Sequence, residues 1–296
     1  GDGVDFVESK PLVLFGHNFA SIAGAGPVIG PIIAMHHFGW VVTLVWILIG
    51  NVFIGAVHDY LSLMISVRNR GSSIADIAEK TMGIRAKYVF SIFLVLAMLL
   101  VIAVFGVVAA KTLIAQPQMV VPTFAIIPIS IALGWFIYYR NSNLAVASIF
   151  AVTGVILSIF FGFQFPVELP ESGIIGLSPL IFWFVVLLVY AALASILPVN
   201  ILLQPRDYLS TYILFGSMAL AVLALLWVQP ELHTPAYRGG FSQEQGPVWP
   251  MLFVLVACGA VSGFHSLVAG GTTSKQLSVE SQGRPIAYGG MLTEGF

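Results

Sequence analysis

One apolar stretch of this sequence carries side chains that can exchange a proton or hold a cation. It contains the adjacent pair His58 and Asp59, flanked along the chain by Asn51, Ser62 and Ser66. At 100° per residue these polar side chains share one face of a helix whose other faces are apolar. An ionisable pair in such a helix is costly unless it is paired or hydrated, so it is a functional candidate by default. The pattern predicts a proton-coupling role for His58 and Asp59, since histidine changes charge near neutral pH.

A plainer interpretation of Asp59 stays open. The basic residues Arg68 and Arg70 follow it along the chain. Asp59 would then be an interfacial residue in an exposed ion pair, which contributes about 0 to 1 kcal/mol.

Two further histidines stand beside small residues. His17 lies in the segment Gly16-His17-Asn18-Phe19-Ala20-Ser21-Ile22-Ala23-Gly24, and His265 lies in Gly263-Phe264-His265-Ser266-Leu267-Val268-Ala269-Gly270. The likeness of the segments suggests an internal repeat, and a stripe of Cys258, Ser262 and Ser266 accompanies His265. His17 and His265 are therefore further candidates for proton coupling, with a hydrogen-bonded packing role as the alternative for each.

Glycine and proline interrupt the first of the apolar stretches. The segment Gly24-Ala25-Gly26-Pro27-Val28-Ile29-Gly30-Pro31 removes backbone donors and helix propensity in the middle of it. We expect a discontinuous helix that lines a substrate cavity; the alternative is a Pro-kinked helix in which Gly26 and Gly30 admit a close neighbour. A second weak region surrounds Gly259, Gly263, Gly270 and Gly271. The candidate substrate-binding residues are Gly24, Gly26, Gly30, Asn51, Ser262, Thr272 and Thr273.

The composition decides which kind of molecule must position these residues. Of 296 residues, 58% are hydrophobic and 8% are charged, against about 25% charged in soluble domains. This excludes an ordinary soluble fold, because so few polar side chains cannot cover a globular surface. The net charge of −1 argues against a nucleic-acid partner, and the single cysteine, Cys258, excludes an intrachain disulfide and a cysteine-based metal cluster. We expect no metal and no cofactor beyond a coupling ion, H⁺ or Na⁺.

Eight stretches have the length and apolarity to cross a bilayer, which takes roughly 20 helical residues. Lipid does not accommodate unpaired backbone groups, and these stretches lack the two-residue alternation of a barrel strand. The spans should therefore be helices. We therefore predict an all-α polytopic membrane protein with one transmembrane domain over residues 1–296, and an interfacial amphipathic helix at 72–83. The eight stretches are 17–35, 40–67, 87–110, 123–139, 144–163, 179–203, 209–229 and 250–269.

Lysine and arginine lie mostly on one side of these spans. Such residues accumulate in short cytoplasmic loops, so residues 1–16 and 68–87 should be cytoplasmic. The sequence also lacks an initial Met and turns apolar at 288–296, so we expect a fragment of a longer chain. Ten basic residues lie on the predicted cytoplasmic side, against only Lys111 and Arg238 on the other: Lys10, Arg68, Arg70, Lys80, Arg85, Lys87, Arg140, Arg206, Lys275 and Arg284.

Several of these segments together resemble the carbon starvation protein A family of bacterial inner-membrane transporters. The resemblance is carried by Leu14 to Pro27 (LFGHNFASIAGAGP), Gly55 to Tyr60 (GAVHDY), Gln204 to Ser210 (QPRDYLS), Ala257 to His265 (ACGAVSGFH) and Gly289 to Glu294 (GGMLTE). It implies uptake of peptides or, for some relatives, pyruvate. It also implies inverted repeats around broken helices and alternating access coupled to H⁺ or Na⁺. Asn18 departs from the family, which often has a second histidine there.

The leading hypothesis is thus a secondary active transporter that imports small peptides or a small carboxylate such as pyruvate during carbon starvation. The alternative is a membrane sensor or structural subunit of a starvation response with no transport of its own. An enzyme is not expected, because no nucleophile and base arrangement is recognisable, and there is no Gly-Lys-Ser/Thr phosphate loop for ATP. The oligomeric state cannot be read from the sequence.

Overall fold

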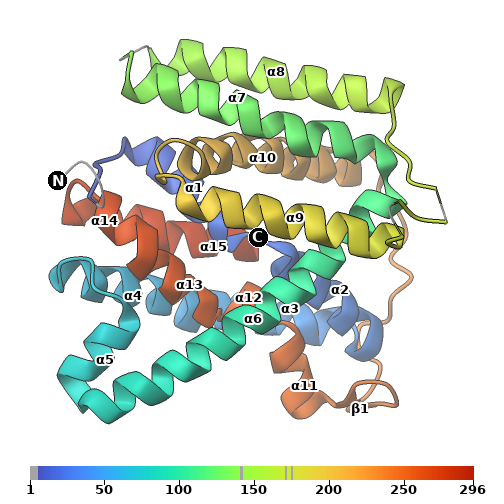
Figure 1. Ribbon diagram of the computed structural model, residues 1–296. Coiled ribbons are helices and arrows are strands. Elements are labelled where there is room, and N and C mark those ends of the chain that lie inside the picture. Colours follow the sequence, from blue (N-terminus) through green and yellow to red (C-terminus); the bar gives the residue numbers. More distant parts are fainter. Residues whose placement is uncertain (1–5, 141–142, 171, 175) are drawn as a thin grey trace. The chain divides into compact units, whose positions relative to one another are not determined.

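The computed structural model describes residues 6–140, 143–170, 172–174 and 176–296. Helices make up most of this part of the chain, as the sequence predicts (Figure 1). Its contacts divide the chain into two compact units. Unit 1 comprises residues 1–81 and 210–296, and unit 2 comprises residues 82–209.

Among the described residues, six helices are long and apolar enough to cross a membrane, and the bent pair α1 (Pro11–Ile22) and α2 (Ala25–Phe38) makes a possible seventh. The chain is therefore an all-α, multi-pass membrane protein. The six are α3–η1–α4 (Trp40–Gly50, Asn51–Gly55, Ala56–Arg68), α6 (Ile84–Ala115), η2–α7 (Pro117–Met119, Val120–Tyr138), α8 (Leu144–Gln164), α9 (Pro179–Ile196) and α10 (Leu203–Val228).

The eighth predicted span, in which the glycines indicated a weakness, is not one of the helices long enough to cross a membrane. The segment expected at 250–269 is split into α11 (Val248–Leu255), α12 (Ala257–Ala260) and α13 (Gly263–Val268). Val261 and Ser262 have extended backbone conformations between α12 and α13. The glycines in this region explain the break, since glycine lowers helix propensity by about 1 kcal/mol relative to alanine.

Unit 2 consists of long regular helices. Helices α7 and α8 pack against each other along their lengths (Figure 1), and α6 packs against α9. A buried cluster of Ala110, Leu113, Val120 and Trp183 joins α6, α7 and α9. The aromatic ring of Phe184 lies directly over Gly106, where a side chain would collide with it. Packing of apolar and small residues therefore accounts for this unit.

Unit 1 is built from shorter and less regular pieces. Helices α1 and α2 meet at a 45° bend, and the span α3–η1–α4 contains a π-helical turn in its middle. After α13, the chain continues through further short helices that pack against α4 and α1. These are η3 (Ala269–Thr273), α14 (Ser274–Gln276), η4 (Glu280–Gln282), η5 (Arg284–Tyr288) and α15 (Gly289–Gly295).

Two small elements complete the fold. The predicted amphipathic segment forms helix α5 (Ile74–Met82), where the Ser73 hydroxyl accepts a hydrogen bond from the Asp76 N–H at 3.2 Å. Its position at a membrane interface stays a prediction. A two-residue hairpin of β1 (Phe241–Ser242) and β2 (Gly246–Pro247) precedes α11, with Phe241 opposite Pro247.

Candidate functional site

Asp59 lies in unit 1 between two histidines. Its Oδ2 atom is 2.7 Å from Nδ1 of His265, and its Oδ1 atom is 2.9 Å from Nδ1 of His58. Asp59 and His265 are buried, while a third of the His58 side chain is exposed. Because His265 is 206 residues away in the sequence, the fold itself assembles this cluster.

Glu294 of α15 approaches the other side of the His265 ring. Its Oε2 atom lies 3.3 Å from Nε2 of His265, and 1% of each side chain is exposed. The two groups are not aligned as a hydrogen bond, and neither His265 Nε2 nor either carboxylate oxygen of Glu294 has a hydrogen-bond partner among the described residues. His265 thus stands between two buried carboxylates.

Each acidic or imidazole group of this cluster lies next to a π-helical turn. The turn η1 precedes His58 and Asp59, η3 follows His265, and η5 precedes Glu294. A π turn adds one residue to a helical turn and is frequent at functional sites. All three segments that bring polar groups to this cluster therefore contain or adjoin such a turn.

A second set of polar contacts joins α1 to η3. The Nε2 atom of His17 is 3.3 Å from the Thr272 hydroxyl, and the Thr273 hydroxyl donates to the Asn18 side-chain oxygen at 2.9 Å. The Asn18 amide group donates to the carbonyl of Ile286 at 3.3 Å. Three of the four residues whose side chains meet here were predicted as site residues. Asn18, noted only as a departure from the family, completes the set.

Glycines bring the broken segments against their neighbours. Gly30 of α2 faces the Leu255 carbonyl between α11 and α12, and Gly55 of η1 faces the Ala260 carbonyl of α12; a side chain at either position would collide with these backbone atoms. Gly259 of α12 in turn lies beside Pro27 of α2. Gly30 therefore has the close-packing role that was the alternative to substrate binding, and this contact brings the two breaks side by side.

The remaining predicted substrate-binding residues have mixed surroundings. Asn51 is buried, and its amide group donates to the Met291 carbonyl at 2.9 Å; its side-chain oxygen has no partner among the described residues. Ser262 lies in the α12–α13 break, 3.6 Å from the Cys258 thiol. Gly24 precedes α2 in an extended conformation, and Gly26 is in its first turn. Their contact with a substrate stays a prediction.

The interfacial interpretation of Asp59 does not match its surroundings. Arg68 pairs with Glu280 at 3.5 Å, and both of these side chains are more than half exposed. Asp59 is buried, and its carboxylate pairs with His58 and His265. Arg68 does form an ion pair, but its partner is Glu280 and not Asp59.

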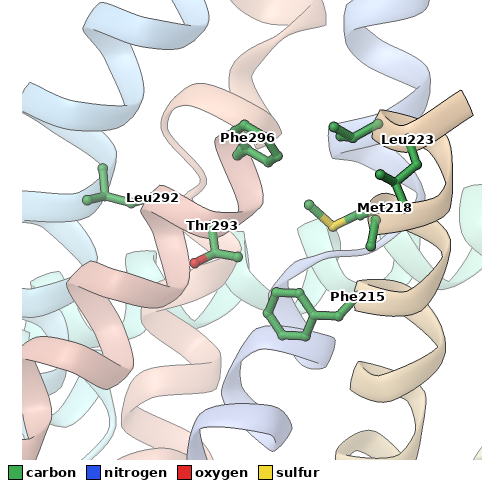
Figure 2. A pocket seen from close by; sticks show the side chains of 8 residues that line it. Phe215, Met218, Leu223, Leu292, Thr293 and Phe296 are labelled. Carbon is green, nitrogen blue, oxygen red and sulfur yellow. The ribbon is translucent and has the colours of Figure 1, made fainter. Parts of the chain in front are cut away.

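An apolar groove is lined in part by Leu292, Thr293 and Phe296, which lie close to Glu294 in the sequence. It has a volume of about 650 Å³ and lies between α10 and α15 of unit 1. Figure 2 shows Phe215, Met218 and Leu223 on one side and Leu292, Thr293 and Phe296 on the other. None of its lining residues was among the predicted site residues, and Thr293 is the one lining side chain with a polar atom.

The family model described as carbon starvation protein CstA matches residues 1–296 of this chain. The chain belongs to the carbon starvation protein CstA family. No solved structure matches it significantly. The resemblance drawn from the sequence is thereby confirmed.

Relatives in this family carry transporter names. The chain is 38% identical over 300 residues to "Peptide transporter CstA" of Campylobacter jejuni, covering 99% of this chain and 42% of the relative. It is 36% identical over 304 residues to "Peptide transporter CstA" of Escherichia coli, covering 100% and 42%. It is 34% identical over 312 residues to "Pyruvate/proton symporter BtsT" of Escherichia coli, again covering 100% and 42%. The chain thus spans about two-fifths of the length of these relatives.

Glu294 was not predicted as a site residue from the sequence. The residue appeared only at the end of a segment that resembles the family, and no helical stripe pointed to it. A signal was present nonetheless, because Glu294 is an acid next to apolar residues in a membrane protein. Its meeting with His265 depends on how η5 and α15 pack on α4 and α1, which sequence periodicity does not describe.

Proposed function

We propose that this chain forms part of a secondary active transporter in the bacterial cytoplasmic membrane. Its solute is a small molecule with a carboxylate, either a short peptide or a pyruvate-like acid, and its import is driven by an ion gradient. The alternating-access mechanism and the inverted-repeat architecture are part of this proposal. The names of the relatives support it, since they describe peptide transporters and a pyruvate/proton symporter.

One structural observation carries the proposal. The buried group of Asp59, His265 and Glu294 lies at interrupted helices of a membrane-spanning chain. Buried ionisable residues are expensive in a membrane and mark ion or substrate pathways. Broken helices at membrane depth are the usual places where transporters bind substrate and coupling ion.

The break before α2 offers a place for a substrate carboxylate. The first turn of α2 has no side-chain cap among the described residues. Helix N-termini attract negative charge through their free N–H groups, and the polar set of His17, Asn18, Thr272 and Thr273 lies on the neighbouring segments. We assign substrate recognition to this region and propose no enzymatic activity for the chain.

The direct test is uptake into vesicles that contain the full-length protein. Labelled dipeptide and labelled pyruvate are supplied separately under a proton gradient, under a sodium gradient, and with no gradient. We expect accumulation of at least one of these solutes under one gradient, and its loss when a matching ionophore collapses that gradient. The ionophore that abolishes uptake identifies the coupling ion.

The same experiment separates the transporter from the alternative class. A sensor or structural subunit would bind a solute without concentrating it. Absence of gradient-driven uptake across a broad panel of peptides and small acids, with the protein correctly inserted, would therefore overturn the proposal.

Membrane orientation is tested independently of substrate. Lys80 and Ser172 are both exposed and lie on opposite predicted sides. In intact cells, a cysteine in place of Ser172 should react with an impermeant thiol reagent, and one in place of Lys80 should be protected. A Cys258→Ala background removes the native thiol of this segment. The opposite labelling would reverse the orientation.

A further inference from the structure

We propose that Cys258, His265 and Glu294 bind a single Zn²⁺ ion. The Cys258 thiol, one ring nitrogen of His265 and one carboxylate oxygen of Glu294 all lie within 4.8 Å of one another. The three residues come from α12, α13 and α15 of unit 1. No metal was predicted from the sequence, whose single cysteine excludes a cysteine-based cluster.

Three polar atoms of the proposed ligands lack hydrogen-bond partners among the described residues. Nε2 of His265 and both carboxylate oxygens of Glu294 are buried without a hydrogen-bond partner among the described residues, and 1% of each side chain is exposed. Buried polar groups in native proteins are nearly always paired, so each exception calls for an explanation such as an ion. A bound cation would satisfy these atoms together.

The spacing of the two groups fits a tetrahedral ion better than a hydrogen bond. His265 Nε2 and Glu294 Oε2 are 3.3 Å apart but misaligned for hydrogen bonding. Zinc binds nitrogen and oxygen ligands at about 2.0 to 2.2 Å. Two such ligands on a tetrahedral ion therefore lie about 3.3 to 3.5 Å from each other.

Asp59 supplies the outer contact that metal-binding histidines usually have. Its carboxylate is 2.7 Å from Nδ1 of His265, which places the ring proton on Nδ1 and leaves the lone pair of Nε2 for the ion. A carboxylate–histidine–zinc arrangement of this kind fixes the tautomer and orients the ring. Asp59 is thus a positioning residue for the proposed site.

The types of ligand select among cations. A thiolate together with an imidazole favours zinc over sodium, magnesium or calcium, which prefer oxygen ligands. The charge of Zn²⁺ would balance the Cys258 thiolate and the Glu294 carboxylate. The Cys258 thiol lies 3.6 Å from the Ser262 hydroxyl, and a thiol forms only weak hydrogen bonds, so it can turn to the ion without losing a strong partner.

The test measures metal rather than transport, so its outcome does not depend on the proposed function. Full-length protein is purified in detergent without chelators, and zinc is quantified by mass spectrometry. We expect about one zinc per chain from this site. After removal of the metal, Co²⁺ titration should give the visible absorption bands of a tetrahedral site and a near-ultraviolet sulfur-to-cobalt charge-transfer band.

Single substitutions test the contribution of each residue to metal binding. Cys258→Ser should abolish the sulfur-to-cobalt band, and Glu294→Gln should lower zinc content strongly. Asp59→Asn should weaken Co²⁺ affinity by about 10- to 100-fold, the usual effect of an outer partner. His17→Gln is the matched control, since it alters a buried histidine that lies 3.3 Å from the Thr272 hydroxyl and is not a proposed ligand, and it should retain full metal content.

Two results would overturn the proposal. One is wild-type protein that lacks zinc and fails to bind Co²⁺. The other is metal that stays bound in Cys258→Ser and Glu294→Gln with unchanged spectra, which would place it elsewhere in the full-length chain. Cys258→Ser is a nearly isosteric change, so the test remains valid even if a His265 variant does not fold.

Discussion

The two compact units satisfy their buried polar groups in different ways. In unit 2 the hydroxyls of Ser130, Ser148 and Ser158 donate to carbonyls three or four residues earlier in their own helices, and Ser148 also meets the Tyr208 hydroxyl, 60 residues later, at 3.0 Å. Unit 1 has local bonds of this kind as well, as from Thr43 to the Gly39 carbonyl, but other bonds there join segments more than 200 residues apart, as between Ser66 and Ser274 or between Thr273 and Asn18. Local bonds leave a helix regular, whereas distant bonds require particular segments to meet.

The charged groups show the same contrast. Arg206 and Asp207 of unit 2 are neighbours in sequence and pair at 2.8 Å. Asp59 of unit 1 pairs with His265, 206 residues later. Unit 1 therefore depends on polar contacts for its architecture as well as for any function, and changes there should have larger effects than matched changes in unit 2.

The largest expected effect is that of Asp59→Asn. The substitution preserves size but removes the negative charge between His58 and His265. We expect gradient-driven uptake by the full-length protein to fall at least about tenfold, because a hydrogen bond to a charged group contributes about 1.5 to 3 kcal/mol and about 1.4 kcal/mol corresponds to a factor of ten. Uptake into vesicles, normalised to inserted protein, is the measurement.

The matched control for this prediction is Asp207→Asn in unit 2. It also removes a buried carboxylate from an ion pair. We expect it to lower stability, while uptake per inserted protein stays coupled to the gradient. If the two variants lost coupling equally, the distinction between the units would fail. Wild-type uptake by Asp59→Asn would remove Asp59 from the mechanism and leave His17 as the next candidate.

A smaller loss is expected from adding one methyl group in unit 1. Gly55→Ala places a carbon against the Ala260 carbonyl, which cannot move without shifting α12. Overpacking of this kind costs about 1 to 3 kcal/mol, and uptake should fall because the Asp59 helix is displaced. Thermal stability in detergent and uptake are measured together.

Gly154→Ala is the corresponding change in unit 2. Its new carbon would be 3.5 Å from Ile129, an ordinary contact. Alanine is the better helix former by about 1 kcal/mol, so stability should stay equal or rise. An equal loss in both variants would show that close glycine contacts do not distinguish unit 1.

The sequence predicted the regular parts of the molecule better than the irregular ones. Long apolar runs such as 144–163 became single helices because length and hydropathy alone dictate a span in lipid. The polar stripe through Asn51, His58 and Asp59 was also visible, since it follows helical periodicity. Glu294 was missed, and the break at Val261 and Ser262 was foreseen only as a weakness, because both depend on packing between segments far apart in the chain.

A smaller effect than that of Gly55→Ala is expected on stability from Thr273→Val. The substitution retains the shape of the side chain but removes the hydroxyl that donates to Asn18 at 2.9 Å. Loss of one buried hydrogen bond costs about 1 kcal/mol, so the Tm should fall by a few degrees. Ser158→Ala, which removes a bond within a single helix of unit 2, should change the Tm less; the reverse order would contradict the contrast between the units.

The smallest effect is expected at the exposed ion pair of Arg68 and Glu280. The atoms Nη2 and Oε2 are 3.5 Å apart, and 69% and 57% of the two side chains are exposed. Pairs of this kind contribute about 0 to 1 kcal/mol because water and salt screen them. Glu280→Gln should therefore leave both uptake and Tm near the wild-type values, measured beside Asp59→Asn at equal insertion. A loss of uptake as large as that of Asp59→Asn would mean that charge near the end of α4, rather than the buried contact with His265, determines transport.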